Sequence, residues 1–412
     1  MAIIKPFRAI RPAPMYASQV AALPYDVYNR KEAKEAVQGN PLSFLNIDRP
    51  ETQFEDDVDM YDPKVYEQAK ILFQQQIQKQ IYQKDPKAGY YIYELTMDGR
   101  IQTGIVACSS IDDYLNQVIR RHENTREEKE IDRIHHVDIL NTQTGPIFLA
   151  YRSNETISSI IEKVKAYPPL YDFTSSDKIS HRVWRIAKPE LIEALYCTFS
   201  EIPNTYIADG HHRAASAVKV GLKRRKEHPD YSGEEEFNYF LSVLFPDDQL
   251  KILPYNRVVR DLIGLSAEDF LSKVERVFTL HPSSVPVQPE KKGVFGLYFN
   301  HTWYRMVIKE EYQTTDPVDG LDVSLLQNHL LNPILGIEDP RTDERIEFVG
   351  GIRGLNELVQ RVETDMAVAF SMYPTSIQEL FSVADAGLLM PPKSTWFEPK
   401  LRSGLFFHSL SE

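Results

Sequence analysis

The stretch of sequence that decides the fold around the candidate site is Thr205-Tyr206-Ile207-Ala208-Asp209-Gly210-His211-His212-Arg213. Residues 205–208 have the composition of a short buried strand, and an alanine-rich helix follows over about residues 212–227. A strand that ends in Asp-Gly and passes directly into a helix forms an anion site, because the first helical turn leaves backbone N–H groups without partners. We therefore expect this segment to bind phosphate.

Each residue of the motif suits that chemistry. Gly210 lacks the Cβ that would keep a phosphate away from the backbone, and Arg213 offers a planar guanidinium to phosphate oxygens. His211 and His212 add further donors, while Asp209 is suited to hold Mg²⁺ or to orient a histidine. An ordinary Asp-Gly turn beside a surface pair of histidines would show the same letters. Zinc binding is the weakest interpretation, since adjacent helical residues face different directions and no nearby Cys or HxxxH motif completes a ligand set.

Composition excludes several classes of protein. The 412 residues, of which 42% are hydrophobic and 11% aromatic, suffice for two or three compact units. A net charge of −12 argues against a nucleic-acid-binding protein, which needs a basic surface, but not against one basic pocket for a small phosphorylated ligand. The two cysteines are far apart, the first residues carry no export signal, and no apolar stretch reaches the about 18 residues of a membrane helix. We expect a cytoplasmic protein without a membrane partner.

Local patterns predict several other elements. Asp98-Gly99 between residues 90–95 and 101–108 predicts a β-hairpin, and Pro63 predicts the start of a helix. Residues 111–143 are strongly charged and lack Gly and Pro, which favours mostly helix. Towards the C-terminus, Thr375 and Gln378 have the spacing of a capping box, with Gly387 as the helix terminator.

Two more segments are dense in donors and acceptors. One contains Arg121, His122, Glu123, Asn124, Thr125, Asp132 and Arg133, and the other contains Lys393, Ser394 and Thr395 within residues 390–397, followed by Lys400 and Arg402. The first group would bind a nucleotide or a carboxylate, or else form a solvated charged helix with exposed ion pairs. In the second, Lys393, Ser394 and Thr395 would bind an anion such as phosphate and the loop would close the site to water, or the loop would serve as a rigid docking element anchored by Trp396 and Phe397.

Several of these motifs, in this order, resemble a known family. Residues 207–213 are similar to the phosphate-binding motif of the ParB-like and free-serine-kinase superfamily, and the whole chain resembles the ParB-related domain-of-unknown-function family 1015. The other matching segments are Leu23-Pro24-Tyr25-Asp26-Val27, Asn40-Pro41-Leu42-Ser43-Phe44, residues 121–125 with Asp132 and Arg133, Pro146-Ile147-Phe148, Leu321-Asp322-Val323 and Met390-Pro391-Pro392-Lys393-Ser394-Thr395.

The resemblance implies a phosphotransferase acting on free L-serine or O-phosphoserine, with ADP or ATP as co-substrate and Mg²⁺ as cofactor. Running from phosphoserine to serine would suit serine biosynthesis. The resemblance also implies that Asp26 is the general base, at a position where the kinases carry Glu, and that His211 and Asp209 are further catalytic residues. Asp26 is also a good capping residue for the helix that follows it. A nucleotide-independent phosphoserine phosphatase and a ParB-like nucleotide-binding regulator are the alternative functions.

The predicted fold is α/β with mixed α+β character. Residues 1–250 would form a ParB-like or serine-kinase-like core, elaborated by the hairpin and charged helix of about residues 60–150. Residues 251–412 would form a second, C-terminal α/β region that closes over the site. Nothing in the sequence indicates an oligomeric state.

Overall fold

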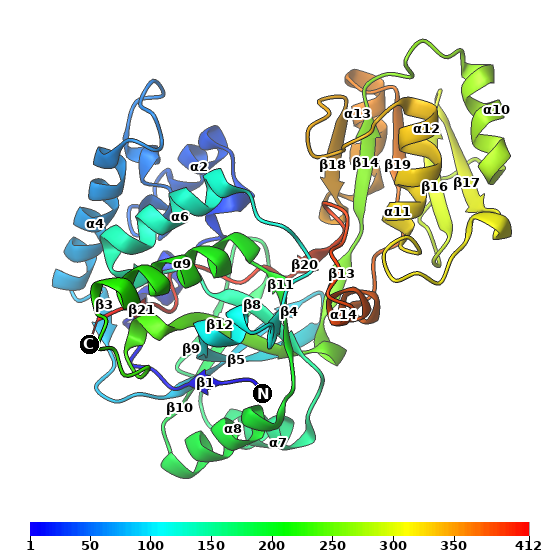
Figure 1. The fold of residues 1–412 in the computed structure, drawn as a ribbon. Helices are drawn as coiled ribbons and strands as arrows, with labels where there is room; N and C mark the ends of the chain where they lie inside the picture. Colours follow the sequence, from blue (N-terminus) through cyan, green and yellow to red (C-terminus); the bar gives the residue numbers. More distant parts are fainter. Residues whose placement is uncertain (412) are drawn as a thin grey trace. The chain divides into compact units, whose positions relative to one another are not determined.

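The computed structural model describes residues 1–411, which divide into two compact units (Figure 1). Residues 1–250 and the C-terminal segment from Pro399 form the first unit, and Lys251–Glu398 form the second. The expectation that residues 251–412 stay together is wrong for this last segment. It returns to the first unit because β21 (His408–Ser409) pairs with β7 (Thr142–Gln143) and the N–H of Phe407 bonds to the carbonyl of Ile10.

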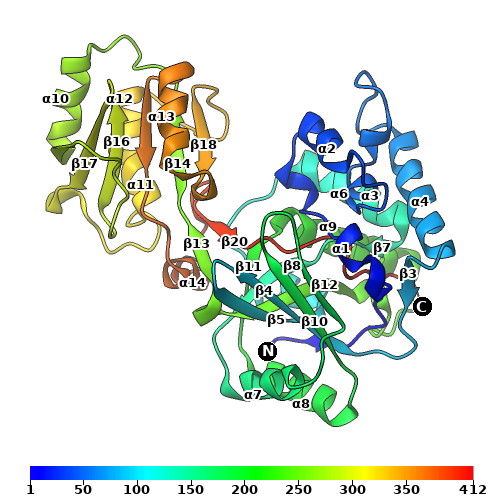
Figure 2. The ribbon, with the colours of Figure 1, turned by 180° about the vertical axis from the view of Figure 1, so that it is seen from behind.

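A nine-stranded mixed sheet forms the centre of the first unit (Figure 2). Its order is β6 (Ile119–Arg120), β11 (Thr205–Asp209), β8 (Ile147–Tyr151), β12 (Tyr239–Pro246), β5 (Arg100–Ser110), β4 (Tyr90–Met97), β10 (Ser180–Ile186) and β9 (Tyr171–Thr174), with β1 (Ile4–Lys5) along β5. β6 pairs with β11 and β8 pairs with β12 in parallel, while the other neighbours are antiparallel. The predicted hairpin is β4–β5, turned by Asp98 and Gly99 at positive φ, and it lies in the middle of the sheet.

Helices cover both sides of this sheet. In Figures 1 and 2, α7 (Glu155–Lys165) and α8 (Pro189–Glu201) lie on one side, and α4 (Pro63–Gln78), α6 (Glu127–Leu140) and α9 (His211–Glu227) on the other. Shorter helices are α1 (Ala17–Val20), α2 (Arg30–Val37) and α3 (Leu45–Asp48), and β2 (Ile10–Pro12) pairs with β3 (Tyr82–Lys84). α9 meets the core through small side chains, Ala214 and Ala217, which lets its backbone approach the sheet closely.

The charged segment 111–143 is less helical than its composition predicts. It contains α5 (Ile111–Leu115), then β6, a loop over residues 121–126, and only then α6. Ile119 and Arg120 are extended because they pair with Thr205 and Tyr206 of β11. Pairing at the sheet edge therefore overrides local helix propensity here.

The second unit contains a six-stranded antiparallel sheet. Its order is β15 (Phe278–Ser283), β17 (Thr302–Ile308), β16 (Val294–Phe299), β19 (Val368–Ser371), β14 (Tyr255–Val259) and β18 (Ile346–Gly350). Its other elements are α10 (Ala267–Val277), α11 (Asp322–Leu326), α12 (Asn332–Leu335), α13 (Gly354–Thr364), α14 (Ile377–Asp385) and the paired strands β13 (Lys251–Leu253) and β20 (Trp396–Glu398).

The cap of α14 lies one residue later than predicted. Ser376 and Glu379 form the capping box, because the hydroxyl of Thr375 donates to the carbonyl of Ser394 instead. Gly387 follows the helix with a φ of 70°, in agreement with its predicted role. Within residues 1–411, every helix is too short or too polar to cross a lipid bilayer.

Candidate active site at the start of helix α9

The turn from β11 into α9 has a backbone conformation that favours glycine. β11 ends at Asp209, Gly210 has a φ of 94° and a ψ of 33°, and α9 begins at His211. A Cβ at Gly210 would lie 3.0 Å from Nε and Nη2 of Arg213. The backbone and the packing therefore both favour a residue without a side chain. The unpartnered N–H groups of the first turn and the positive end of the helix dipole make this turn attractive to anions.

His211 packs edge to face against His122. Their ring centroids are 4.6 Å apart at an interplanar angle of 89°, and both side chains are buried. Burial lowers the pKa of His122 to about 4, and burial together with the neighbouring His122 keeps the pKa of His211 well below its ordinary value. Both rings are therefore neutral at pH 7. Nδ1 of His211 lies 3.6 Å from Oε2 of Glu123, and its buried Nε2 has no hydrogen-bond partner.

Arg213 is held in place by the protein backbone and by Asp209. Its Nη1 donates to the carbonyl of Pro146 at 2.7 Å, and its Nη2 lies 3.5 Å from Oδ2 of Asp209. Lys400 places its Nζ 3.4 Å from the same oxygen. Burial alone would raise the pKa of Asp209, but Lys400 and Arg213 outweigh it and hold this pKa below its usual range. Asp209 thus stays ionised between two cations, while the buried Nε of Arg213 has no hydrogen-bond partner.

His212 faces a different set of groups. Its Nε2 accepts a hydrogen bond from the backbone N–H of Arg126 at 3.0 Å. Burial lowers the pKa of His212, the charge of Lys129 lowers it further, and the charge of Asp26 raises it. Both charged side chains therefore lie near the start of α9.

Asp26 lies in a short 3₁₀ turn, Tyr25–Val27, and its side chain is exposed. Nη1 of Arg49 donates to the carbonyls of Tyr25 at 3.0 Å and Tyr28 at 2.7 Å, one on each side of Asp26. The interpretation of Asp26 as a helix cap is wrong, because Asn29 caps α2. Arg49 thus holds the turn that carries this carboxylate.

Behind this turn lies a buried group of charges. The guanidinium of Arg133 stacks 3.9 Å from the ring centre of Tyr25 and pairs with Asp48 at 3.1 Å and with Asp132 at 2.8 Å. Tyr66 donates to Asp132 at 2.8 Å. A cavity of about 30 Å³, room for one or two waters, is lined by Arg133 and Arg213 among others. Arg133 therefore stabilises the turn that carries Asp26 through its stacking on Tyr25.

The other predicted residues of the first unit lie in the loop over residues 121–126, and some of them contact the start of α9 while Arg121 does not. His122 and Glu123 contact or approach His211, as described above, and Thr125 hydrogen-bonds to Glu130. Arg121 is exposed, with its guanidinium 6.0 Å from the ring centre of Tyr114. The solvated-helix interpretation is wrong for residues 121–126, which form a loop, and His122 is buried in it.

Lys393, Ser394 and Thr395 belong to the second unit. Arg257 donates to the carbonyl of Lys393 at 3.1 Å, and the hydroxyl of Ser394 donates to the carbonyl of Pro391 at 2.6 Å. These bonds fix the local course of the loop. A role of the three residues in phosphate binding stays a prediction.

Sequence reasoning missed two residues of this site, Arg49 and Lys129. Arg49 acts through carbonyls of residues more than 20 positions away, which no local pattern reveals. Lys129 lies in a run of charged residues, and such a run is typical of solvent-exposed surface, so the sequence does not single this residue out. Among residues 1–411, no three His, Cys, Asp or Glu side chains gather in a way that suits a metal ion.

Comparisons with known proteins give a family match and distant structural similarities. The model of a family described as "Protein of unknown function (DUF1015)" matches residues 4–324, whereas no curated protein matches the chain. A free serine kinase in complex with AMP is similar at 12% identity and a TM-score of 0.37, over 74% of this chain and 91% of that one. A conserved hypothetical protein from Pyrococcus furiosus has 13% identity and a TM-score of 0.35, over 74% and 94%. SbnI with C-terminal truncation from Staphylococcus aureus has 11% identity and a TM-score of 0.36, over 73% and 86%.

Proposed function

Since the chain belongs to the DUF1015 family, whose members are described as proteins of unknown function, we propose a function from its own site. We propose that it is a phosphotransferase that moves a phosphoryl group between free L-serine or O-phosphoserine and an adenine nucleotide. The observation that carries the proposal is the glycine turn at the start of α9, with the carboxylate of Asp26 near it.

Phosphate would bind at Gly210, His211, His212 and Arg213. The helix N-terminus supplies backbone donors, and Arg213 supplies a guanidinium already oriented by Pro146 and Asp209. Nε2 of His211 and Nε of Arg213 are buried without partners, which costs free energy that a bound acceptor recovers. Phosphoryl transfer depends mainly on such positioning and charge stabilisation, which the turn at Gly210 supplies.

Asp26 is the proposed acid and base. When O-phosphoserine reacts, the bond from phosphorus to the seryl oxygen breaks and a new bond forms to a terminal phosphate oxygen of ADP. The departing seryl oxygen would take up a proton from solvent through the carboxyl group of Asp26, and in the opposite direction the carboxylate of Asp26 would take the proton of the serine hydroxyl. The hold of Arg49 on the flanking carbonyls keeps this group in one position.

Mg²⁺ belongs to the proposal as the ion that accompanies the nucleotide. Magnesium commonly uses one or two carboxylates together with phosphate oxygens and waters, and Asp209 would supply the carboxylate. The ion would neutralise phosphate charge, while Lys400 and Arg213 balance Asp209 itself.

The test is to incubate the full chain with Mg²⁺, ADP and O-phosphoserine, and in parallel with ATP and L-serine, and to follow phosphorus NMR spectra. We expect ATP to form from phosphoserine, and Asp26→Asn and His211→Ala to reduce the rate at least about a hundredfold. Asp57→Asn, which alters an exposed carboxylate of the same unit, should retain the rate. Inorganic phosphate released without ADP would overturn nucleotide dependence in favour of a phosphatase, and no reaction in either direction would overturn the serine assignment.

A further inference from the structure

One arginine of the second unit is buried without a carboxylate partner. Arg257 lies on β14, and only 3% of its surface is exposed. Its guanidinium donates to the carbonyls of Tyr255 and Lys393, and to no other group of residues 1–411. A guanidinium has more N–H donors than these two bonds use. The charge of Arg257 and part of its donor set are therefore left available to a ligand.

Within residues 1–411, the strands beside Arg257 supply no carboxylate to it. Arg257 lies opposite Phe348 of β18 and Phe370 of β19, so its side chain shares their face of the sheet. Its guanidinium carbon lies 5.3 Å from the ring centre of Phe348. The acidic residue of β18, Glu347, pairs with Arg361 at 2.7 Å instead. Arg257 is thus surrounded by aromatic side chains and not by a counter-charge.

The burial of this charge is costly. Burial lowers the pKa of Arg257 from 12.5 to about 9, which still leaves the side chain charged at pH 7. A charge in a protein interior is destabilising unless an opposite charge compensates it, and two carbonyl dipoles offset only part of the cost. An anion at the guanidinium would offset most of the remainder, because the low dielectric of the interior strengthens their attraction.

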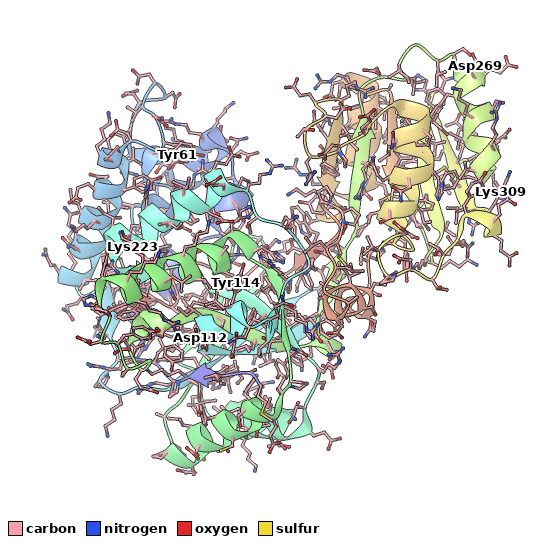
Figure 3. The ribbon with its side chains drawn as sticks, viewed as in Figure 1. Tyr61, Asp112, Tyr114, Lys223, Asp269 and Lys309 are labelled. Carbon is pink, nitrogen blue, oxygen red and sulfur yellow. The ribbon has the colours of Figure 1, made fainter. Side chains whose placement is uncertain are left out.

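A second cation of this unit illustrates a carbonyl-bound charge that needs no anion. Lys309, labelled in Figure 3, donates to the carbonyls of Glu275 and Arg276 at 2.8 Å and 2.9 Å. These carbonyls belong to the last turn of α10, where the helix dipole is negative, and Lys309 is partly exposed to water. The carbonyls that bind Arg257 lie in a strand and a loop, and its side chain is buried, so neither effect compensates it.

The loop before β20 brings another positive charge next to Arg257. The carbonyl of Lys393 accepts from Arg257 at 3.1 Å, and Nζ of Lys393 lies 5.4 Å from the ring centre of Tyr255. The loop is held by Thr375, whose hydroxyl donates to the carbonyl of Ser394 at 2.9 Å. Two positive charges of the second unit are therefore adjacent, one buried and one exposed.

We propose that the second unit binds an oxyanion of a small molecule, a phosphate or a carboxylate group, with Arg257 as its main ligand and Lys393 beside it. A guanidinium binds two oxygens of either group in its plane, and an ammonium adds a point charge. The half-buried rings of Tyr255 and Trp396, edge to face at 5.0 Å, offer an apolar surface to the rest of the molecule. This site belongs to the second unit alone and does not depend on phosphoryl transfer at Gly210.

Equilibrium dialysis of the full chain against labelled inorganic phosphate tests the proposal. We expect phosphate to bind at Gly210 and at Arg257, so Gly210→Ala and Arg257→Met should each lose one site, and a variant with both changes should lose both. Circular dichroism checks that each variant is folded. Arg260→Met, which alters an exposed arginine directly after β14, is the matched control and should bind phosphate like the unaltered chain.

Dialysis with acetate separates a carboxylate from a phosphate. An anion bound at Arg257 should be retained by Gly210→Ala and bind at least about tenfold more weakly once Arg257→Met is added. If neither phosphate nor acetate shows this difference, the inference is overturned, whatever happens at Gly210. Phosphate held at Arg257 but not at Gly210 would support this site and overturn the phosphate turn.

Lys393→Gln provides a second variant at an exposed position, in case Arg257→Met does not fold. In the Gly210→Ala chain it should weaken the retained anion about tenfold, because the nearby ammonium charge is lost. An unchanged affinity in this variant would overturn the part assigned to Lys393, and, with Arg257→Met unfolded, the site as a whole.

Discussion

Lys400 places its Nζ 3.4 Å from Oδ2 of Asp209, a contact that spans 191 residues of sequence. Both side chains are largely buried, with 14% and 29% of their surfaces exposed. Because Arg213 approaches the same oxygen, Asp209 lies between two cations. The C-terminal segment therefore takes part in the electrostatics of the strand-to-helix turn, and does more than complete the fold of the first unit.

Replacing Lys400 by methionine tests this contact. Asp209 would keep only Arg213 as ionic partner, so we expect its pKa to rise and Arg213 to be drawn towards it. The free energy of unfolding should fall by about 1–2 kcal/mol, and ADP should bind about tenfold more weakly. Urea denaturation and calorimetry measure the two effects. Lys400→Arg, which keeps the charge, should restore most of both, and equal behaviour of the two variants would contradict an ionic role.

Gly210→Ala is expected to damage binding more than stability. A non-glycine residue at a φ of 94° costs about 1–2 kcal/mol, and the new methyl group would press on the guanidinium of Arg213. Displacing Arg213 and filling the space above the helix N-terminus should abolish detectable ADP binding. Calorimetry with ADP and thermal unfolding of the variant give the two readouts.

Gly233 provides the matched control for this substitution. Its φ is 99°, but a Cβ there would meet no atom within 4 Å. Gly233→Ala should therefore cost a similar conformational free energy and leave ADP binding unchanged. If both alanine variants bound ADP normally, the turn at Gly210 would not be the phosphate site.

Local sequence signals predicted the elements that depend on neighbouring residues. The hairpin β4–β5 follows from Asp98-Gly99, and α9 follows from the alanine-rich stretch after Gly210. Predictions were wrong where the role of a residue depends on a partner distant in the sequence. Thr375 had the right spacing for a cap, but its hydroxyl serves the carbonyl of Ser394, so Ser376 caps the helix instead.

The candidate site also contains some residues that local sequence predicts and others whose role depends on tertiary contacts. Residues 209–213 are contiguous, and one strand-to-helix turn positions all of them. The support for Asp26 comes from Arg49, and the counter-charge for Asp209 comes from Lys400. These contacts join distant segments, and a charged or polar residue in a loop carries no local sign of its partner. The sequence placed Lys400 in a segment near the site, but only the three-dimensional arrangement identifies Asp209 as its partner and brings Arg49 to the Asp26 turn.

Arg49 is expected to act as a positioning residue. Arg49→Lys keeps the positive charge but loses the planar donors that reach the carbonyls of Tyr25 and Tyr28. The turn that carries Asp26 should then move more freely, so kcat should fall about tenfold to a hundredfold while KM for ADP stays within about twofold. Steady-state kinetics in the direction of ATP formation measures this division.

Arg30 offers a matched control for Arg49. It also donates to two carbonyls, those of Val58 and Glu55, at 2.6 Å each. Those carbonyls belong to a loop that does not carry Asp26. Arg30→Lys should therefore leave kcat unchanged, and an equal loss of kcat in both variants would indicate general loosening of the fold.

Burial of His122 predicts that the protein loses stability in mild acid. Its pKa falls from about 6.5 in an unfolded chain to about 4 in the folded state, because burial disfavours the charged ring. Between these values the unfolded chain binds the extra proton, so this stabilisation is complete above about pH 6.5 and is lost as the pH falls towards 4. The loss from this residue amounts to at most about 3 kcal/mol. His211, with a pKa lowered in the same direction, adds to this loss of stability.

Urea denaturation at intervals from pH 7 to pH 4 should show a steep fall in the free energy of unfolding for the unaltered chain and a shallower one for His122→Gln. His135→Gln, at an exposed position of α6, should keep the steep fall, and parallel curves for all three proteins would show that His122 contributes nothing to it.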